Sequence, residues 1–129
     1  MTPDPQEYGK AAELAAEQYF RRNGYSILGR NVRYSNGELD LVVGLGEAII
    51  FVEVKARRTF QFGGAAYAIG RHKQHRLVQL ASQYLAHHGL NHRPCRFDVI
   101  LFQGDIPSQD QVHHIEHAFE ISGENGKWS

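Results

Sequence analysis

The sequence predicts an α/β fold in which a mixed central β-sheet is flanked by α-helices. Two segments have the apolar spacing of amphipathic helices, and five have the apolar pattern of strands. They follow one another as helix, three strands, helix and two strands, an order typical of such a sheet. The chain has 129 residues, enough for one hydrophobic core and not for two. We therefore expect residues 1–122 to form a single domain and residues 123–129 a frayed tail.

The first helix is expected to begin at Pro5 and to end at Asn23–Gly24. Asp4 can cap it with its side chain, proline suits the first helical position, and Glu7 places an acid in the first turn. The glycine at its end can adopt the left-handed conformation that stops a helix. An apolar stripe follows the helix at Ala12, Ala16, Tyr19 and Phe20. Glu13 lies at the edge of this stripe.

Three strands are expected next, at residues 25–34, 37–43 and 48–55. Residues 35–37 have the composition of a tight turn, and residues 44–47 are expected to turn the chain again. Residues 59–70 are rich in glycine and aromatic residues, which predicts a loop.

A second helix is expected at residues 71–88, and Gly89 can end it. Apolar side chains recur in it at helical spacing, at Leu77, Leu80, Ala81, Tyr84 and Leu85. Residues 96–102 form an almost continuous apolar run, typical of a strand that is buried on both faces. Residues 112–121 are expected to form a last strand at the edge of the sheet.

The composition, with 42% hydrophobic and 22% charged residues, is typical of a globular protein. The first residues lack the basic and apolar regions of a secretion signal. No apolar run approaches the roughly 20 residues that a membrane-spanning helix needs. Cys95 is the single cysteine, so the chain cannot form an internal disulfide, which favours a reducing compartment. We expect no membrane partner and a cytoplasmic location.

The net charge is zero, but the charges are distributed unevenly along the chain. Residues 54–97 contain eight Lys or Arg and no acid, whereas residues 98–129 contain six acids and one lysine. The basic segment can hold the phosphates of a nucleic acid, although a solvated helix face followed by an acidic tail explains the pattern equally well. The residues expected to bind nucleic acid are Arg57, Arg58, Arg71, His72, Lys73 and Arg76.

The clearest functional signal is a set of acidic residues and one lysine on two strands and a helix. Glu53 and Lys55 are two residues apart in a strand, so their side chains share a face. Such a pair is usually a solvated ion pair, but this strand is otherwise apolar, and burying its charges is costly unless something compensates them. Asp40 interrupts the neighbouring apolar strand and can face them, and Glu13 can approach from the helix. Glu38 shares a face with Asp40 and is either a supporting partner or a solvated residue.

These residue types suit a hard divalent cation and a phosphodiester. Asp40 and Glu53 are expected to bind Mg²⁺, or Mn²⁺ in its place, together with the carbonyl of Val54 and water. Such an ion lowers the pKa of a bound water and neutralises charge that develops on the phosphate. Lys55 is expected to orient or deprotonate that water. Glu13 is expected to hold the ion through water or to help bind a second one.

An ordered set of motifs in this chain resembles a known family. The motifs are Gly37-Glu38-Leu39-Asp40-Leu41-Val42, Phe51-Val52-Glu53-Val54-Lys55-Ala56-Arg57, Phe62-Gly63, Lys73 and Arg96-Phe97-Asp98-Val99. With them the chain resembles the YraN-like family of bacterial proteins, a branch of the restriction-endonuclease-like PD-(D/E)xK superfamily similar to archaeal Holliday-junction resolvases. The resemblance extends from Gly9 to about Phe102. The chain departs from the family pattern at Ala12, where glycine is usual, and at Tyr67, where an acid is usual.

The resemblance implies a restriction-endonuclease-like fold and Mg²⁺-dependent cleavage of DNA that leaves 5′-phosphate ends. Carried over by position, Glu13 is the helix glutamate, Asp40 the metal-binding aspartate, and Glu53 and Lys55 the last pair. We therefore expect a metal-dependent endonuclease that acts on structured DNA, either branched or single-stranded. Junction cutting would favour a homodimer, since two strands must be nicked. The sequence leaves open a non-cleaving nucleic-acid-binding or scaffold protein that retains the same fold.

Weaker candidates for function are Phe60, Phe62, Tyr67, Cys95, His113, His114 and His117. The three aromatic residues can stack on unpaired bases or fix a loop to the core. The three histidines lack the cysteines and the helical spacing of common zinc sites. The cysteine has no activating neighbour in the sequence and is expected in the core.

Overall fold

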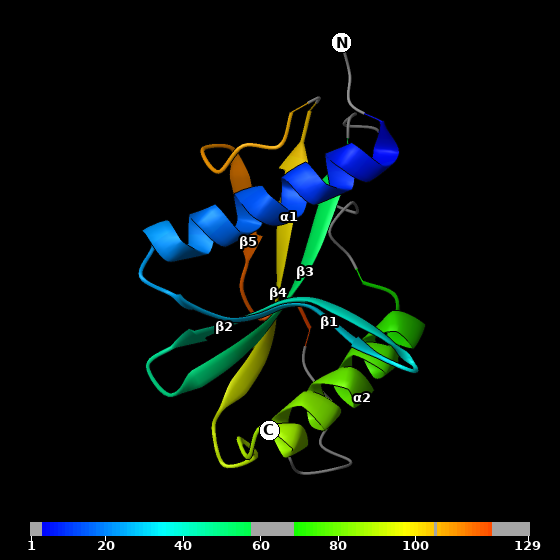
Figure 1. The fold of residues 1–129 in the computed structure, drawn as a ribbon, viewed down its shortest axis with the longest axis vertical. Coiled ribbons are helices and arrows are strands. Elements are labelled where there is room, and N and C mark those ends of the chain that lie inside the picture. Colours follow the sequence, from blue (N-terminus) through cyan, green and yellow to red (C-terminus); the bar gives the residue numbers. More distant parts are fainter. Residues whose placement is uncertain (1–3, 58–68, 105, 120–129) are drawn as a thin grey trace.

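The computed structural model describes residues 4–57, 69–104 and 106–119 (Figure 1). Its elements are α1 (Pro5–Arg22), β1 (Ser26–Tyr34), β2 (Gly37–Leu45), β3 (Ala48–Arg57), α2 (Arg71–His87), β4 (Cys95–Gln103) and β5 (Val112–Ile115). Within these residues the strands form one sheet in the order β1-β2-β3-β4-β5. The pair β3–β4 is parallel, and the other pairs are antiparallel. The predicted mixed α/β sheet is confirmed, and the arrangement is consistent with a restriction-endonuclease-like fold.

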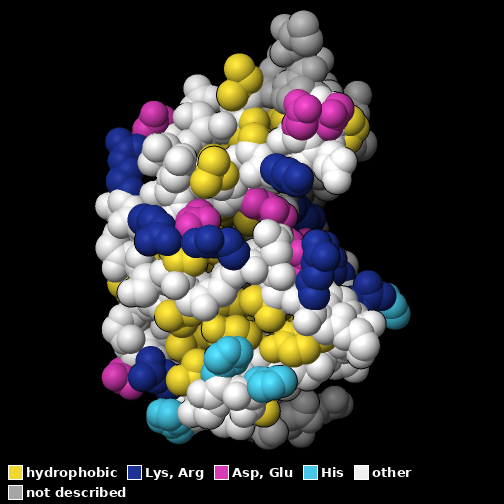
Figure 2. Space-filling view, in the orientation of Figure 1, with side chains coloured by type: hydrophobic (Ala, Val, Ile, Leu, Met, Phe, Trp, Pro, Cys, Tyr) yellow, Lys and Arg dark blue, Asp and Glu magenta, His cyan; other side chains and the backbone are white. Residues whose placement is uncertain are grey.

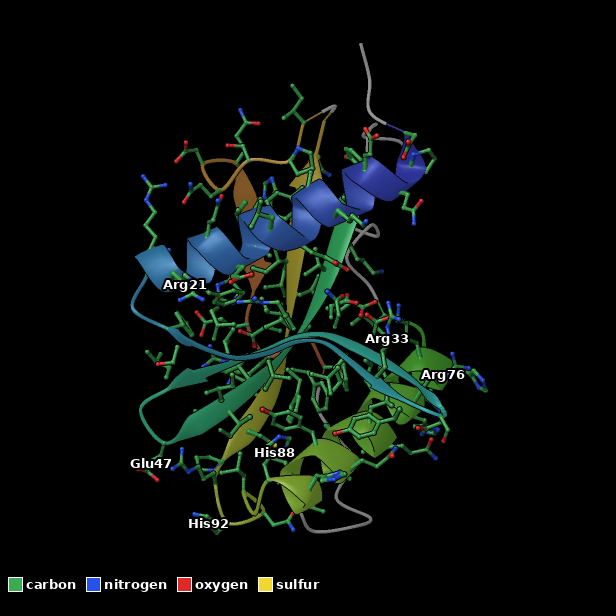
Figure 3. The ribbon with its side chains drawn as sticks, in the orientation of Figure 1. Arg21, Arg33, Glu47, Arg76, His88 and His92 are labelled. Atoms are coloured by element: carbon green, nitrogen blue, oxygen red, sulfur yellow. The ribbon has the colours of Figure 1, made fainter. Side chains whose placement is uncertain are left out.

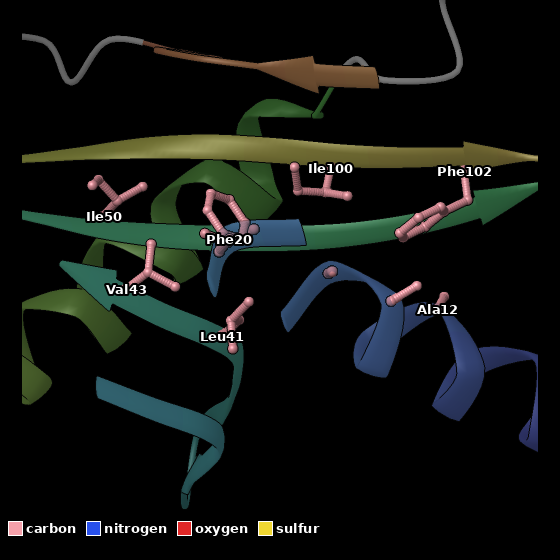
Figure 4. Packing of buried hydrophobic residues seen from close by; sticks show 10 residues of the cluster. Ala12, Phe20, Leu41, Val43, Ile50, Ile100 and Phe102 are labelled. Atoms are coloured by element: carbon pink, nitrogen blue, oxygen red, sulfur yellow. The ribbon is translucent and has the colours of Figure 1, made fainter. Parts of the chain in front are cut away.

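The two helices cover opposite faces of the sheet (Figure 1). On one face α1 packs against alternate residues of the central strands, and Figure 4 shows this cluster with Ala12, Phe20, Leu41, Val43, Ile50, Ile100 and Phe102. On the other face α2 packs against Leu39, Val42, Ile49, Phe51 and Phe97. Because side chains alternate along a strand, even-numbered residues of β3 face α1 and odd-numbered residues face α2. Glu53 therefore lies on the face that α2 covers.

Most of the predicted elements are confirmed to within a residue or two. At the start of α1 the Asp4 side chain accepts a hydrogen bond from the Glu7 N–H (2.8 Å). Strand β2 is longer than predicted, since it continues through Gly44 to Leu45. Gly46 begins the turn that follows, with φ of 59°, the left-handed conformation required at the first position of one type of two-residue hairpin turn.

The last strand is shorter than predicted. Strand β5 ends at Ile115, whereas the sequence predicted a strand over residues 112–121. At His117 the backbone turns with φ of 51°, and its N–H donates a hydrogen bond to Asp98 (3.2 Å). The turn interrupts the regular pairing of β5 with β4, although the Ala118 N–H beyond it still donates to the Phe97 carbonyl of β4 (2.8 Å). The predicted frayed tail, most of the predicted loop at 59–70, and Phe60, Phe62 and Tyr67 lie outside the described residues.

Asp98 connects α1, β4 and β5 from inside the core. Its side chain is fully buried and accepts hydrogen bonds from Arg96 Nε (2.9 Å) and His114 Nε2 (2.7 Å). The other ring nitrogen of His114 is hydrogen-bonded to the Tyr19 hydroxyl of α1 (2.9 Å). Burial alone would raise the pKa of Asp98, but the hydrogen bonds from His114 and Arg96 outweigh it and hold the pKa below its ordinary value. The protein itself thus neutralises this buried acid.

We expect Asp98→Ala to lower the free energy of unfolding by about 3–5 kcal/mol, because it leaves buried positive charge without its carboxylate. Urea unfolding at neutral pH measures this change. Since folding lowers the pKa of Asp98, its contribution is present above the ordinary value of 3.8 and is lost as the pH falls through the folded-state value. Asp110→Ala, which breaks an exposed pair with Arg22 (2.7 Å), is the control. Equal losses in the two variants would contradict the role assigned to Asp98.

Candidate metal and nucleic-acid site

Strands β2 and β3 separate at Asp40. Their ladder runs from the pair Leu45–Ala48 to the pair Leu41–Val52, so Asp40 is the first residue of β2 beyond it. Oδ2 of Asp40 accepts a hydrogen bond from the backbone N–H of Val54 (2.9 Å). A backbone N–H needs an acceptor, and for the N–H of Val54 the Asp40 carboxylate takes the place of a main-chain carbonyl. The separation of the strands holds the Asp40 side chain against the end of β3.

The carboxyl groups of Asp40 and Glu53 meet where the strands separate. The Glu53 side chain is only 9% exposed, and it is hydrogen-bonded to that of Asp40. Burial, and then the negative charge of Glu53, raise the pKa of Asp40 to about 7, although the hydrogen bond from Val54 opposes them. Two acids are therefore held together with incomplete compensation of their charge. A bound cation would compensate the remaining negative charge of the two acids.

Two more acids extend the pair toward α1. The charge of Glu13 contributes to the raised pKa of Asp40. The pKa of Glu13 is itself raised by burial and by the charge of Glu38. With its amide nitrogen turned toward them, Asn31 of β1 donates to Glu38 Oε1 (2.8 Å) and Glu13 Oε1 (3.2 Å). Together Glu13, Glu38, Asp40 and Glu53 form what we call the acidic group.

Asn31 adopts an unusual conformation for a residue within a strand. Its φ is 49°, in the left-handed region that asparagine tolerates better than most non-glycine residues. In the register between β1 and β2, its neighbours Arg30 and Val32 pair with Leu41 and Leu39, so Asn31 lies opposite Asp40. The local backbone strain therefore coincides with the acidic group.

Two lysines lie on the α2 side of the acidic group. Lys55 follows Glu53 by two residues on β3, shares its strand face and is half-buried. Lys73 reaches from the first turn of α2 and forms an ion pair with Glu53. Beside them is a hollow, whose lining includes Leu39, Phe51, Leu77 and Phe97. This apolar lining explains why the Glu53 carboxyl group is poorly hydrated.

Basic side chains gather at the start of α2. Five of them are exposed there, namely Arg71, His72, Lys73, His75 and Arg76. The first turn contains no acid, and the N-cap residue Gly70 offers no side-chain hydrogen bond. Positive charge at a helix N-terminus opposes the helix dipole, so helix stability does not explain this arrangement. Figure 2 shows Lys and Arg side chains beside Asp and Glu across the middle of this face, and Figure 3 shows Arg33 on the same side as Arg76.

Residues 12–102 match the model of the uncharacterised protein family UPF0102. The chain belongs to this family. UPF0102 is the YraN family that the sequence motifs predicted, and the match includes all of the acidic group and the start of α2.

Individual UPF0102 proteins are similar over most of their length. The protein of Hahella chejuensis is 42% identical over 113 residues, which cover 88% of this chain and 90% of that protein. The protein of Symbiobacterium thermophilum is 41% identical over 111 residues, or 86% and 94% of the two chains. A Pseudomonas putida protein is 44% identical over 119 residues, or 90% and 95%.

The structure of this UPF0102 protein brings together several residues singled out from the sequence. Asp40 and Glu53 are in contact, and Glu13 is close enough to influence the pKa of Asp40. Their roles as metal ligands stay predictions. The side chain of Arg57 and the whole of Arg58 lie outside the described residues.

Some residues of the site were missed by sequence reasoning or given another role. Asn31 was missed, although a polar residue of low strand propensity within a strand was a signal for it. Lys73 was expected to bind nucleic acid, which stays a prediction, and its ion pair with Glu53 was not foreseen. His114 was weighed as a zinc ligand, and in the structure its ring is hydrogen-bonded to Asp98 and Tyr19.

Two remaining expectations concern zinc and cysteine chemistry. In the described ranges no three His, Cys, Asp or Glu side chains form a ready-made metal-binding cluster. Mg²⁺ does not need one, since it commonly uses one or two carboxylates and several waters. Cys95 is half-buried, and burial raises the pKa of its thiol to about 12, which leaves it unreactive.

No helix among the described residues combines the length and the apolar content needed to cross a membrane.

The metal-free protein should lose stability as the pH rises, because of Asp40. Folding raises the pKa of this group from 3.8 to about 7, so its contribution is fully present below 3.8 and is lost as the pH rises through 7. Asp40→Asn keeps an acceptor for Val54 without the charge. At about 1.4 kcal/mol per pKa unit, this variant should be more stable than the wild type at pH 8 by up to about 4 kcal/mol.

Urea unfolding in EDTA at pH 4 and pH 8 measures this difference, with Asp110→Asn as the exposed control. The stabilisation by Asp40→Asn should be small at pH 4, where the wild-type carboxyl is protonated in the folded protein. A difference independent of pH would show that Asp40 does not have the assigned pKa.

Proposed function

We propose that this protein is a divalent-metal-dependent endonuclease that hydrolyses phosphodiester bonds in structured DNA. The supporting observation is a contrast between two acidic positions of the core. Asp98 receives hydrogen bonds from His114 and Arg96 and lies beside the positive charge of Arg96, and together these lower its pKa. Asp40 lies against the carboxyl group of Glu53, and its pKa is raised. The protein thus compensates one acid and leaves the other pair suited to an added cation.

The chemistry of the donor set fits Mg²⁺ or Mn²⁺. Both ions prefer oxygen ligands, and Mg²⁺ typically binds through one or two carboxylates plus water. Asp40 and Glu53 would hold the ion, with the Val54 carbonyl and Glu13 as further oxygen donors. When bound, the ion supplies a Lewis acid that activates water and neutralises developing charge on phosphate.

Residues of the chain supply the remaining parts of the reaction. Lys55, on the face of Glu53, would orient the attacking water, accept its proton, or stabilise charge on the phosphate oxygens. Asn31 would keep Glu13 and Glu38 in place. The basic residues at the start of α2 would hold flanking phosphates and so position the backbone of the DNA.

The choice of branched or single-stranded DNA rests on the resemblance to Holliday-junction resolvases. A homodimer would place two such sites against one junction, because each protomer then cuts one strand.

A second candidate is a nucleic-acid-binding protein that does not cleave. The ion pair between Lys73 and Glu53 favours it, since a lysine can neutralise a buried carboxylate without any metal. In this case the basic residues bind DNA and the acidic group has a structural role.

Cleavage of DNA of different shapes separates the two candidates. The protein is incubated with four-way junction, flap, single-stranded and linear duplex DNA, with Mg²⁺ or Mn²⁺. We expect cleavage of branched or single-stranded DNA, slowed about 100-fold or more by Asp40→Asn or Glu53→Gln, since a metal site contributes several kcal/mol.

The matched control is Glu47→Gln, an exposed acid in the turn between β2 and β3, far from Arg33 and Arg76 in Figure 3. It should cleave as the wild type does. DNA binding without cleavage of any substrate, unaltered in the Asp40 and Glu53 variants, supports the second candidate.

The start of α2 should account for much of the salt dependence of DNA binding. The double variant Arg71→Gln/Arg76→Gln should bind more weakly and reduce the slope of log K against log salt by about 1.4–1.8, the release of two phosphate contacts. Fluorescence anisotropy in EDTA between 50 and 200 mM salt, roughly the range where this effect is large, measures it. Arg21→Gln/Arg22→Gln, at the far end of α1 (Figure 3), is the control. Equal slopes for the two double variants would exclude α2 from the interface.

A further inference from the structure

Lys73 provides a positive charge for the buried carboxylate of Glu53. Its Nζ forms an ion pair with Glu53 Oε2. The Lys73 side chain is 51% exposed, whereas that of Glu53 is 9% exposed. A half-exposed lysine on a flexible stem therefore neutralises one of the acids that we expect to hold the metal.

The lysine of the Lys73–Glu53 ion pair is much more exposed than the side chains that contact Asp98. The side chains that contact Asp98, those of Arg96 and His114, are only 16% and 10% exposed. Each makes a further hydrogen bond to a tyrosine hydroxyl. Lys73 is exposed along much of its length, so its ammonium group can move away without opening the core. The cation at Glu53 is exchangeable in a way that the enclosed partners of Asp98 are not.

Lys73 and a divalent cation require the same carboxylate. Two cations at neighbouring positions repel each other, and salt screens this repulsion less at a partly buried site than in open solvent. Lys73 must therefore leave Glu53 Oε2 when this carboxylate takes a divalent cation.

The released ammonium group stays on a surface suited to anions. Lys73 lies on the first turn of α2, between the exposed Arg71 and Arg76. No acid in this turn competes for it, and Gly70 offers no side-chain hydrogen bond to the free N–H groups. A phosphate of the DNA backbone is the ligand whose charge matches these groups.

We propose that Lys73 is an exchangeable counter-ion, which neutralises Glu53 in the metal-free protein and moves to a phosphate of DNA when a divalent cation occupies the acidic group. The inference rests on the proposed metal-dependent function and adds a coupling to it. Because Lys73 cannot serve both partners, a metal strengthens the binding of DNA, and by reciprocity DNA strengthens the binding of the metal.

Manganese binding without DNA tests the competition at Glu53. The dissociation constant of Mn²⁺ is measured on the full chain from the electron paramagnetic resonance signal of the free ion. Lys73→Gln removes the competing charge and should tighten Mn²⁺ binding about tenfold, within the range of effects that supporting residues have on metal sites. Lys73→Arg retains the charge and should bind as the wild type does. Lys10→Gln, an exposed lysine of α1, is the control.

DNA binding tests the move to phosphate. Fluorescence anisotropy with a four-way junction is measured in EDTA and in Ca²⁺, which replaces Mg²⁺ to limit cleavage. Ca²⁺ should raise the affinity of the wild type at least about fivefold, a typical coupling between two ligands. The gain should be smaller for Lys73→Gln and unchanged for Lys10→Gln.

The outcomes distinguish this inference from the proposed function. Equal Mn²⁺ affinities of the wild type and Lys73→Gln overturn the exchange and leave a metal-dependent nuclease intact. An equal gain from Ca²⁺ in the two proteins overturns the move to phosphate. Failure of both proteins to bind Mn²⁺ overturns the metal-dependent function and the exchange together.

Discussion

The close approach of the Asp40 and Glu53 carboxyl groups is the constraint on which the rest of the site depends. Neither group can be moved far, because one receives the hydrogen bond of the Val54 N–H and the other belongs to a buried strand. Bringing two acids together in a poorly hydrated place raises the free energy of the charged state, as the pKa of about 7 at Asp40 indicates. Surrounding residues must therefore reduce this charge or bring in positive charge. Lys73 does so from α2.

The separation of β2 from β3 explains how residues from both faces of the sheet reach one place. Glu13 belongs to α1, which covers one face, and Glu53 points to the face covered by α2. In an intact ladder the sheet would keep these side chains apart. Beyond the pair Leu41–Val52 the two backbones no longer pair, and the Asp40 carboxyl group there contacts Glu53 and also senses the charge of Glu13. The parallel pairing of β3 with β4 requires a crossover, and α2 in this crossover places its basic first turn beside the acids.

The sequence predicted those parts of the fold and site that depend on local patterns. The cap at Asp4 and the two acids in apolar strands could be recognised because each stands out from its immediate neighbours. Contacts between distant segments could not be recognised in this way. The turn that follows β5 is held by a hydrogen bond between residues 19 apart, from His117 to Asp98. The ion pair from Lys73 to Glu53 likewise depends on how α2 is placed, which no short pattern encodes.

Three departures from local stability rules occur within this one region. Asn31 has a left-handed backbone within a strand, two carboxyl groups share a poorly hydrated place, and α2 begins with cations at the positive end of its dipole. Each is unfavourable for folding, and the remaining core shows that the chain can avoid such conflicts, since Asp98 is fully compensated. Folded proteins accept such conflicts mainly where function requires them. Adding a divalent cation and a phosphate would relieve the second and third together, because the cation compensates the acids and the phosphate compensates the helix start.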